Sequence, residues 1–203
     1  MILLDEIVLK KAGTLPYAQA LQAMREFTAG RGESTPDEIW VVEHAPVYTL
    51  GQGAASSLKN ETSIPLVRSD RGGEITYHGP GQAVLYTLVD LARRGLTVKR
   101  FVWLLEQAVI DLVGPGAERR RGAPGVYVGG AKLAALGIRV KRGRAYHGLA
   151  LNVDMDLAPF AAIDPCGYPG LAVTQLRDIG FKENVSEVGN RLAHILMQHL
   201  DHA

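Results

Sequence analysis

The sequence predicts an α+β fold, in which a mixed, largely antiparallel sheet is flanked by helices. Three segments carry apolar residues at helical spacing, and six short apolar runs between them are separated by turn residues. The 203 residues, 47% hydrophobic and 21% charged, show no repeat, low-complexity tract or linker. Length alone would also allow two small domains, but the even composition predicts one domain over residues 1–203.

The helices are predicted from their apolar stripes and from capping residues at their starts. The first follows Thr14 and places Tyr17, Leu21 and Met24 on one face, and the second is the most regular of the three. The third closes the chain after another capping residue. The predicted helices are Leu15–Ala29, Thr97–Val113 and Ser186–Leu200.

The strands are predicted from short apolar runs bounded by turn chemistry. Arg142, Gly143 and Arg144 separate the last two runs, which are therefore expected to form a hairpin. The predicted strands are Glu38–Glu43, Val47–Leu50, Pro65–Arg68, Gln82–Leu91, Lys132–Arg142 and Tyr146–Met155.

Composition excludes several classes of protein. No run approaches the roughly 18 apolar residues of a membrane helix, and the N-terminus lacks the basic and apolar regions of a signal peptide, so we expect a cytoplasmic protein that does not bind membranes. The single cysteine cannot form an internal disulfide. The histidines show no zinc-binding spacing and Gly-x-Ser-x-Gly is absent, so neither a metal site nor a serine hydrolase is expected.

Charge is unevenly distributed although the net charge is only +1. Between Arg93 and Arg144 the chain has many more Lys and Arg than Asp and Glu, and the remainder is acidic. Overall neutrality argues against a dedicated nucleic-acid-binding protein. The basic segment is either an ordinary solvated surface or a docking surface for an acidic partner.

Cys166 is a candidate nucleophile because of its surroundings. A lone cysteine is most often a small buried apolar residue. Here Pro165, Gly167, Pro169 and Gly170 prevent a regular helix or central strand, so the thiol is expected on a shaped loop of the kind that displays reactive groups. Such a thiol needs a neighbouring base or cation to become a thiolate at neutral pH.

Lys132 is the candidate for that base. In a regular strand it shares one face with Leu136, Ile138 and Val140, unless a bulge intervenes. A lysine against an apolar surface is partly desolvated, which makes its amine a usable base. The alternative is a strand-end lysine whose amine reaches water.

Two glycine-containing segments indicate a binding site. Residues 71–82 hold four glycines and a proline and match neither the Walker nor the dinucleotide pattern. His78 within them either orients a substrate or moves a proton, or is a hydrogen-bonding strut. In Tyr146–Met155, His147 shares the parity of Leu149, whereas Gly148 and Ala150 on the other face leave room for an extended apolar chain.

Four segments in order resemble the signatures of the lipoyl(octanoyl) transferases: RGGEITYHGPGQ, GVYVGGAKLAALGIRV, YHGLALNVDMDL and DPCGYPG. WVVEHAPVYTLGQG is also similar, so the likeness spans about Trp40 to Gln175. The resemblance implies the fold of biotin and lipoate protein ligase catalytic domains. One departure is Ala131, where some members of the family carry a second lysine, so Lys132 is the only local candidate for the base.

The family's acyl-carrying cysteine corresponds to Cys166, and the lysine that activates this thiol to Lys132. The resemblance also implies a set of substrate contacts. These are Arg71, Gly72, Gly73, Glu74, Ile75, Thr76, Tyr77, His78, Ala135, Leu136, Gly137, Gly148, Leu149 and Ala150.

The activity implied by the resemblance is transfer of an octanoyl group from octanoyl-acyl carrier protein, through a thioester on Cys166, to a lysine of a lipoyl domain. The expected acceptors are the E2 subunits of 2-oxoacid dehydrogenases and the glycine cleavage H protein. No cofactor is expected beyond the donor's own phosphopantetheine, and the enzyme is expected to be monomeric. Arg119–Arg121 and Lys141–Arg144 are the docking candidates. The alternatives are an ATP-dependent lipoate or biotin protein ligase and a catalytically inactive binding module.

Overall fold

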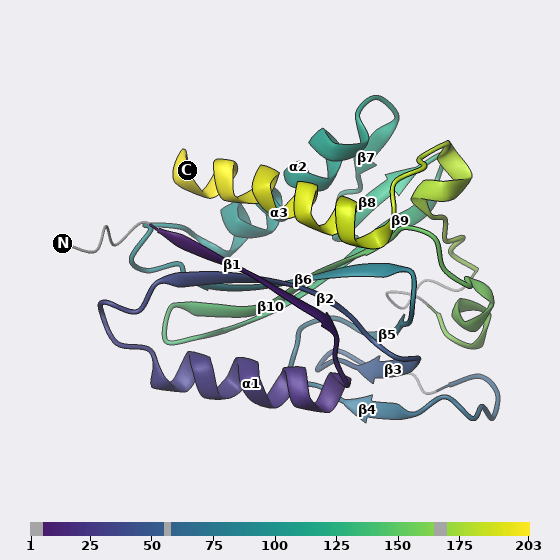
Figure 1. Ribbon diagram of the computed structural model, residues 1–203. Coiled ribbons are helices and arrows are strands. Elements are labelled where there is room, and N and C mark those ends of the chain that lie inside the picture. Colours follow the sequence, from purple (N-terminus) through teal and green to yellow (C-terminus); the bar gives the residue numbers. More distant parts are fainter. Residues whose placement is uncertain (1–5, 55–57, 165–169) are drawn as a thin grey trace.

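The computed structural model describes residues 6–54, 58–164 and 170–203, and it places helices on both faces of a central sheet (Figure 1). α2 and α3 cover one face, and α1 lies on the other face beside a second, smaller sheet. The predicted α+β class is therefore confirmed. The helical elements are α1 (Tyr17–Gly30), α2 (Val98–Val113), α3 (Val185–Asp201) and the 3-10 turns η1 (Ala158–Ala162) and η3 (Leu176–Ile179).

The central sheet has the strand order β1-β2-β6-β10-β9-β8-β7, and the smaller sheet has the order β4-β3-β5. Only the β1/β2 and β3/β4 pairs are parallel; the other pairs are antiparallel. The strands are β1 (Ile7–Thr14), β2 (Asp37–Glu43), β3 (Val47–Leu50), β4 (Leu66–Arg68), β5 (Ile75–His78), β6 (Gln82–Asp90), β7 (Ala117–Arg119), β8 (Gly125–Val128), β9 (Ala131–Lys141) and β10 (Arg144–Asn152).

Each face of the central sheet has its own core. On one face, α2 and α3 bury side chains such as Phe101 and Leu192 against β6 and β10. On the opposite face, α1 packs Leu21 and Met24 against the same strands, with Ala150 in the same cluster. β6 and β10 are therefore buried on both sides, which holds them rigidly in the middle of the molecule.

Most predicted elements agree with the structure, but four strands and one cap were not predicted correctly. β1, β7 and β8 were not predicted, and neither was β5 (Ile75–His78), which lies within the glycine-containing segment 71–82. Thr14 was predicted to cap the first helix, yet it ends β1, and α1 begins after Pro16 without a side-chain cap. The β9–β10 hairpin is confirmed, with Lys141 paired to Arg144.

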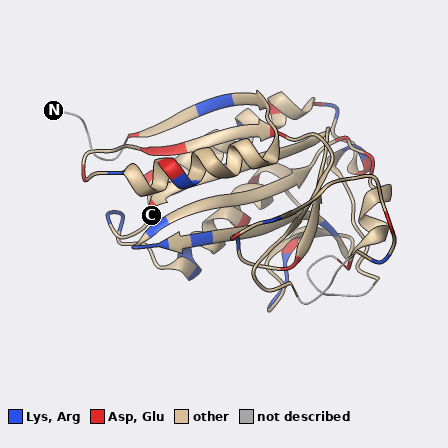
Figure 2. Cartoon of the chain, turned by 90° about the horizontal axis from the view of Figure 1, so that it is seen from below, with Lys and Arg blue, Asp and Glu red and all other residues tan. Residues whose placement is uncertain are grey.

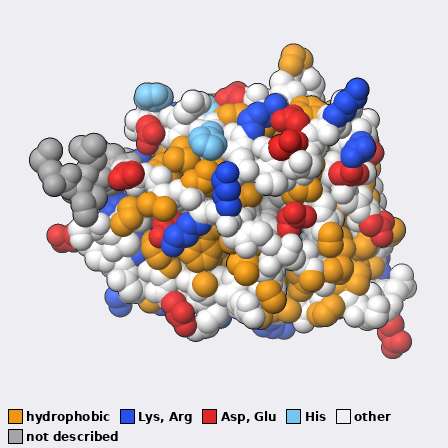
Figure 3. Space-filling model, viewed as in Figure 1, with side chains coloured by type: hydrophobic (Ala, Val, Ile, Leu, Met, Phe, Trp, Pro, Cys, Tyr) orange, Lys and Arg blue, Asp and Glu red, His pale blue; other side chains and the backbone are white. Residues whose placement is uncertain are grey.

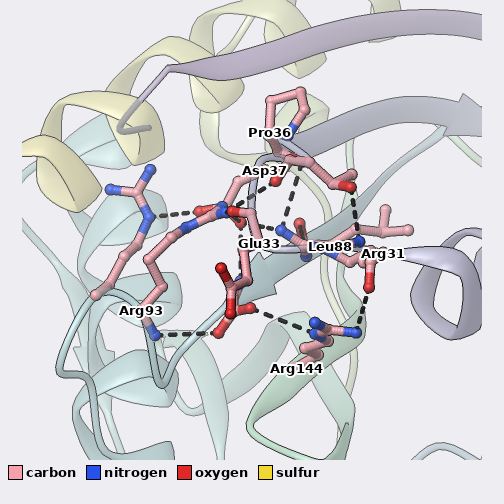
Figure 4. Close-up of polar contacts among 11 residues, drawn as sticks. Arg31, Glu33, Pro36, Asp37, Leu88, Arg93 and Arg144 are labelled. Atoms are coloured by element: carbon pink, nitrogen blue, oxygen red, sulfur yellow. Dashed lines mark hydrogen bonds and ion pairs between the residues drawn. The ribbon is translucent and has the colours of Figure 1, made fainter. Parts of the chain in front are cut away.

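The buried carboxylate of Asp37, at the start of β2, links this strand to three arginines outside the sheet. Asp37 is fully buried and accepts hydrogen bonds from Arg31 at 2.5 Å, Arg93 at 2.7 Å and Arg94 at 2.5 Å. Figure 4 shows the side chains of Arg31 and Arg93 converging on it. Desolvation opposes ionisation of Asp37, but hydrogen bonds from Arg94 and Arg31 outweigh it and hold the carboxyl pKa below its usual value.

Within the part of the chain that the structure describes, no helix is both long and apolar enough to span a bilayer.

Candidate functional site

A narrow cavity of about 50 Å³ lies between β6, β10 and β9 of the central sheet and the segment that leads into β5. This is room for roughly four water-sized spheres at 10–15 Å³ each. Its exposed lining is mostly apolar. We call it the acyl cavity. Its lining residues are Tyr17, Arg71, Gly73, Glu74, Ile75, Thr76, His78, Val84, Tyr86, Ala135, Leu136, Gly137, His147, Gly148, Leu149 and Ala150.

Three segments that are distant in sequence meet at this cavity, and all three contain expected substrate contacts. Residues 71–78, 135–137 and 148–150 each contribute to the lining. Gly72 and Tyr77 do not: Gly72 lines a neighbouring groove, and Tyr77 packs against Tyr48 and Phe160 beneath the smaller sheet. Gly148 is required sterically, because a Cβ there would lie 2.1 Å from the carbonyl oxygen of Leu85.

Four further residues of the lining were not identified from the sequence: Tyr17, Val84, Tyr86 and His147. Tyr17 was placed on the buried stripe of the first helix, which was interpreted only as core. Val84 and Tyr86 alternate along β6 with the same parity as Gln82, so the strand period was the available signal. Val84 and Tyr86 lie outside the three segments 71–78, 135–137 and 148–150, so the sequence did not indicate that they line the cavity.

His147 differs from its predicted orientation. Strict alternation predicted that it shares the face of Leu149, on the side of α2 and α3. Its φ of 62° lies instead in the left-handed region, which few non-glycine residues adopt, and its ring stacks on Tyr146 at 5.0 Å between centroids. Its Nε2 lies 2.8 Å from Oδ1 of Asp70. The carboxylate therefore holds the imidazole on the α1 side, against the acyl cavity.

Asp70 collects three donors beside this histidine. Tyr146 donates to it at 2.7 Å and Arg25 at 3.0 Å, in addition to the contact with His147. Burial raises the pKa of Asp70, but hydrogen bonds from His147, Tyr146 and Arg25 outweigh it and hold the pKa well below its usual range. Asp70 is thus a fixed negative charge that orients one wall of the cavity.

His78 is buried at the inner wall of the acyl cavity. Its Nδ1 lies 2.7 Å from Oε1 of Gln82, and its ring stacks on Tyr17 at 5.9 Å. Desolvation lowers the pKa of His78 to about 3, so the imidazole is neutral at physiological pH. Because Gln82 accepts at Nδ1, the neutral ring carries its proton there. This geometry suits a hydrogen-bonding strut that shapes the cavity.

Lys132 is buried, with only 3% of its surface exposed, so its amine does not reach bulk water. β9 has a bulge at Leu133, directly after Lys132. Val126 of β8 pairs with Ala134 and the next residue, Tyr127, pairs with Lys132, so Leu133 has no partner in β8. The face shared with Leu136, Ile138 and Val140 therefore does not extend to Lys132. Its amine donates to the carbonyl oxygen of Pro124 at 3.1 Å and lies 5.4 Å from the centre of the Tyr127 ring.

Cys166 lies outside the described residues, but the chain that follows it is fixed next to Lys132. The amide of Lys132 donates to Ala172 at 2.8 Å, and the amide of Thr174 donates to the carbonyl of Lys132 at 3.0 Å. Asn152 supports this contact by donating to the carbonyl of Thr174 at 2.9 Å. A small cavity lined by Lys132, Asn152, Thr76 and Ala135 joins this region to the acyl cavity, because the last two residues line both.

A second, more open groove of about 300 Å³ runs along β9 where β8 no longer pairs with it. Its walls come from α2 and from the turn between β7 and β8, and we call it the edge groove. It meets the acyl cavity at Gly73, Glu74, Leu136 and Gly137, which line both. Its remaining lining residues are Gly72, Val102, Gly122, Ala123, Pro124 and Ile138.

The two candidate docking surfaces, Arg119–Arg121 and Lys141–Arg144, differ in the contacts that their side chains make. At the hairpin, Arg144 donates to the carbonyl of Arg31 at 2.7 Å and pairs with Asp90 at 3.4 Å, so it belongs to the internal network beside Asp37. Arg120 and Arg121 lie at the β7–β8 turn beside the edge groove. Elsewhere, Lys and Arg are interspersed with Asp and Glu along the chain (Figure 2) and over the face seen in Figure 3.

Among residues 6–54, 58–164 and 170–203, no group of three His, Cys, Asp or Glu side chains is arranged to hold a metal ion.

Comparison with known proteins identifies the family. The model described as lipoyl protein ligase A/B catalytic domain matches residues 16–196. A relative named octanoyltransferase from Aromatoleum aromaticum is 56% identical over 196 residues, covering 95% of this chain and 85% of the relative. Another octanoyltransferase, from Dechloromonas aromatica, is 55% identical over 198 residues, covering 96% of this chain and 97% of the relative.

Solved structures show the same fold at low sequence identity. A putative lipoate protein ligase from T. acidophilum with bound lipoic acid aligns with a TM-score of 0.73 and 16% identity, covering 97% of this chain and 93% of that one. A biotin protein ligase from Aquifex aeolicus with biotin and ATP gives 0.55 and 10%, covering 96% and 70%. The predicted resemblance to the lipoyl(octanoyl) transferases is thus confirmed, and the chain belongs to the lipoyl protein ligase A/B catalytic domain family.

Proposed function

We propose that this enzyme transfers an octanoyl group from octanoyl-acyl carrier protein to a lysine of a lipoyl domain, by way of a thioester on Cys166. The observation that supports the proposal is the mostly apolar acyl cavity, which adjoins the region of the buried Lys132 amine at Thr76 and Ala135. An unbranched acyl chain fits a narrow apolar space, and a lysine at its end supplies the base that a thiol requires.

In the first half-reaction, Lys132 takes the proton of the Cys166 thiol. The thiolate then attacks the thioester carbonyl of octanoyl-phosphopantetheine. A carbon–sulfur bond to Cys166 forms as the bond to the pantetheine sulfur breaks, and the leaving thiolate recovers the proton from Lys132. A thioester is already activated for acyl transfer, so this step consumes no nucleotide, and we propose that no cofactor or metal takes part.

In the second half-reaction, the amine of the acceptor lysine attacks the acyl-enzyme. An amide forms, Cys166 leaves as a thiolate, and the proton released by the amine returns to the Cys166–Lys132 pair. The proposed acceptors are the lipoyl domains of 2-oxoacid dehydrogenase E2 subunits and of the glycine cleavage H protein. We propose that the enzyme acts as a monomer in the cytoplasm.

Intact-mass measurement tests the thioester directly. The wild-type chain mixed with octanoyl-acyl carrier protein should gain about 126 Da, the mass of an octanoyl group that replaces one hydrogen. The adduct should be absent in Cys166→Ser, and it should disappear from the wild type when apo lipoyl domain is added. A wild-type chain that gains no mass would contradict the proposal and favour a binding module.

The same assay distinguishes the ligase alternative, which shares this fold. Octanoate, ATP and apo lipoyl domain are supplied without acyl carrier protein. The proposed transferase should leave the lipoyl domain unmodified, because it has no means to activate a free acid. Product formed at a rate comparable with that from the thioester donor would overturn the proposed donor.

A further inference from the structure

An exposed tryptophan on α2 lies between two arginines. Trp103 is 38% exposed, and the guanidinium carbons of Arg100 and Arg119 lie 4.4 Å and 4.5 Å from its ring centre. Arg119 is also held by two other side chains of α2, since it pairs with Glu106 at 3.1 Å and donates to Gln107 at 2.7 Å. The stack is therefore ordered before any partner binds, which reduces the entropy cost of using it in an interface.

Three further basic residues lie close to this stack in the sequence. Lys99 lies one helical turn before Trp103, and the β7–β8 connection adds Arg120 and Arg121. We call the set Lys99, Arg100, Trp103, Arg119, Arg120 and Arg121 the basic–aromatic patch. Its acidic neighbours are Glu106, paired to Arg119, and the exposed Glu118, 3.8 Å from Arg120. Five cations therefore face two carboxylates, and an aromatic–arginine centre is typical of binding hot spots.

The patch borders the edge groove on two sides. Val102, which lines the groove, precedes Trp103 on α2, and Gly122, also in the lining, follows Arg121. The groove then continues to Pro124, whose carbonyl oxygen accepts the hydrogen bond from Lys132. A ligand that enters beside the patch is thus led along the edge of β9 toward the Lys132 amine.

The patch and the β9–β10 hairpin, the two candidate docking surfaces, differ in their distance from Lys132. Arg120 lies 4.4 Å and the Lys132 amine 5.4 Å from the centre of the same Tyr127 ring, so the two cationic groups are at most 9.8 Å apart. Lys141 is nine residues along β9 from Lys132, about 30 Å at 3.3 Å per residue. A phosphopantetheine arm is comparable with about five extended residues, roughly 18 Å. An arm that starts at the hairpin could therefore not bring its thioester to Lys132.

We propose that the acidic acyl carrier protein docks on the basic–aromatic patch, and that its phosphopantetheine arm lies in the edge groove with the acyl chain in the acyl cavity. This inference rests on the proposed function. The patch complements an acidic surface in charge, while the glycines of the groove carry no side chain and so leave room for the arm. The two cavities join at Gly73, Glu74, Leu136 and Gly137, where arm and acyl chain would meet.

The test reverses charge at the patch with the double variant Arg100→Glu, Arg121→Glu and follows acyl-enzyme formation by intact mass in single turnover. With octanoyl-acyl carrier protein at low salt, the rate should fall roughly tenfold or more. With octanoyl-pantetheine, which carries the arm but no protein, it should equal the wild-type rate. The matched control, Lys141→Glu, Arg142→Glu, changes the same charge at the hairpin and should leave both rates unaltered.

A patch variant that loads normally from the carrier, or a hairpin variant that is slowed instead, would overturn the docking site. If the patch variant loads normally but passes its acyl group slowly to the lipoyl domain, the patch serves the acceptor and the inference is wrong. A wild-type enzyme that gains no adduct from either donor would instead refute the proposed function.

The groove has its own test. Val102→Trp fills it from the α2 side without altering the patch charge. Acylation from octanoyl-pantetheine should slow at least several-fold relative to acylation from the octanoyl thioester of N-acetylcysteamine, whose arm is shorter. Equal slowing with the two thioesters, or none with either, would show that the arm takes another path.

Discussion

Lys132 and Val173 face each other in a parallel backbone bridge, closed by one hydrogen bond to Ala172 and one from Thr174. The strand that carries the proposed base is thereby tied to the chain that follows the Cys166 loop. Two backbone bonds restrict how far the two segments can move apart. Lys132 is therefore anchored to residues 172–174 by main-chain geometry rather than by side-chain contacts alone.

Asn152 is predicted to position this bridge. It is 5% exposed, and besides donating to Thr174 it accepts from Gln82 at 2.9 Å. Asn152→Asp keeps the acceptor but loses the donor. The Thr174 carbonyl then faces a carboxylate, and acyl-enzyme formation from octanoyl-pantetheine should fall roughly 10- to 100-fold.

The measurement is single-turnover intact mass, with the pH dependence of the rate recorded alongside. A positioning role requires the maximal rate to fall while the shape of the pH profile is retained. Wild-type kinetics in Asn152→Asp would contradict the prediction. Far-ultraviolet circular dichroism provides the control for folding.

Asp37 is predicted to be a major determinant of stability. Asp37→Asn leaves Arg31, Arg93 and Arg94 without their shared charge, and the side chain of Arg31 is fully buried. Uncompensated buried charge costs about 3–5 kcal/mol, to be measured by urea unfolding. In the control, Glu183→Gln breaks the exposed pair with Arg191 and should cost less than about 1 kcal/mol. Equal costs would show that the Asp37 network contributes little.

Acid should destabilise the fold before its carboxylates titrate. Desolvation lowers the pKa of His78 from 6.5 to about 3, so between these values the unfolded chain binds a proton that the folded chain does not. The free energy of unfolding therefore falls as pH drops from about 6.5 toward 3. One such group contributes a slope of about 1.4 kcal/mol per pH unit. Burial also lowers the pKa values of His44 and His147, which add to the effect.

His78→Gln tests this slope. Urea unfolding at a series of pH values between 4 and 6 should show a weaker pH dependence in the variant than in the wild type, by about the contribution of one proton. The comparison uses slopes, so a uniform loss of stability in His78→Gln does not affect it. Identical slopes would mean that His78 is protonated in the folded state.

The acyl cavity should select chain length. Ala150 lines it and is 5% exposed, so the two methyl groups added by Ala150→Val project into a space of about 50 Å³. Overpacking of this kind costs about 1–3 kcal/mol. Acylation by octanoyl-pantetheine should therefore slow roughly tenfold, whereas butyryl-pantetheine should be much less affected. The ratio of the two rates within one variant is its own control, and an unchanged ratio would place the acyl chain elsewhere.

The helices and the long strands β6, β9 and β10 could be predicted because their signal is periodic and local, whereas β1 was missed. The predicted helix Thr97–Val113 shows this periodic signal: it is confirmed as α2 (Val98–Val113), which Thr97 caps by accepting a hydrogen bond from the amide of Arg100. Among the short strands, β3 and β4 were predicted, but β5, β7 and β8 were not. Ile75–His78 and Gly125–Val128 lie in glycine-containing segments typical of loops. The first becomes a strand by pairing with β3, and the second by pairing with β7 and β9. A strand of four residues carries little information about its distant partner.

Side-chain direction at the site also depended on distant residues. Alternation placed His147 with Leu149, but Asp70, 77 positions earlier, draws the imidazole to the other face. The bulge at Leu133 similarly arises from the pairing with β8 and not from a residue type visible in β9. The family motifs identified the segments around the cavity, whereas Tyr17 and Tyr86 became apparent only from the folded chain.

The edge of β9 beyond Ala135 has a consequence for solubility. β8 ends its pairing there, and the loop before β5 covers the strand through the bond from the Gly72 amide to the carbonyl of Ile138 at 2.9 Å. An uncovered strand edge is a template on which another chain can add a strand. The glycine loop that lines both cavities thus also protects nascent and unliganded copies from pairing with one another, so loop variants selected for altered substrates would tend to aggregate.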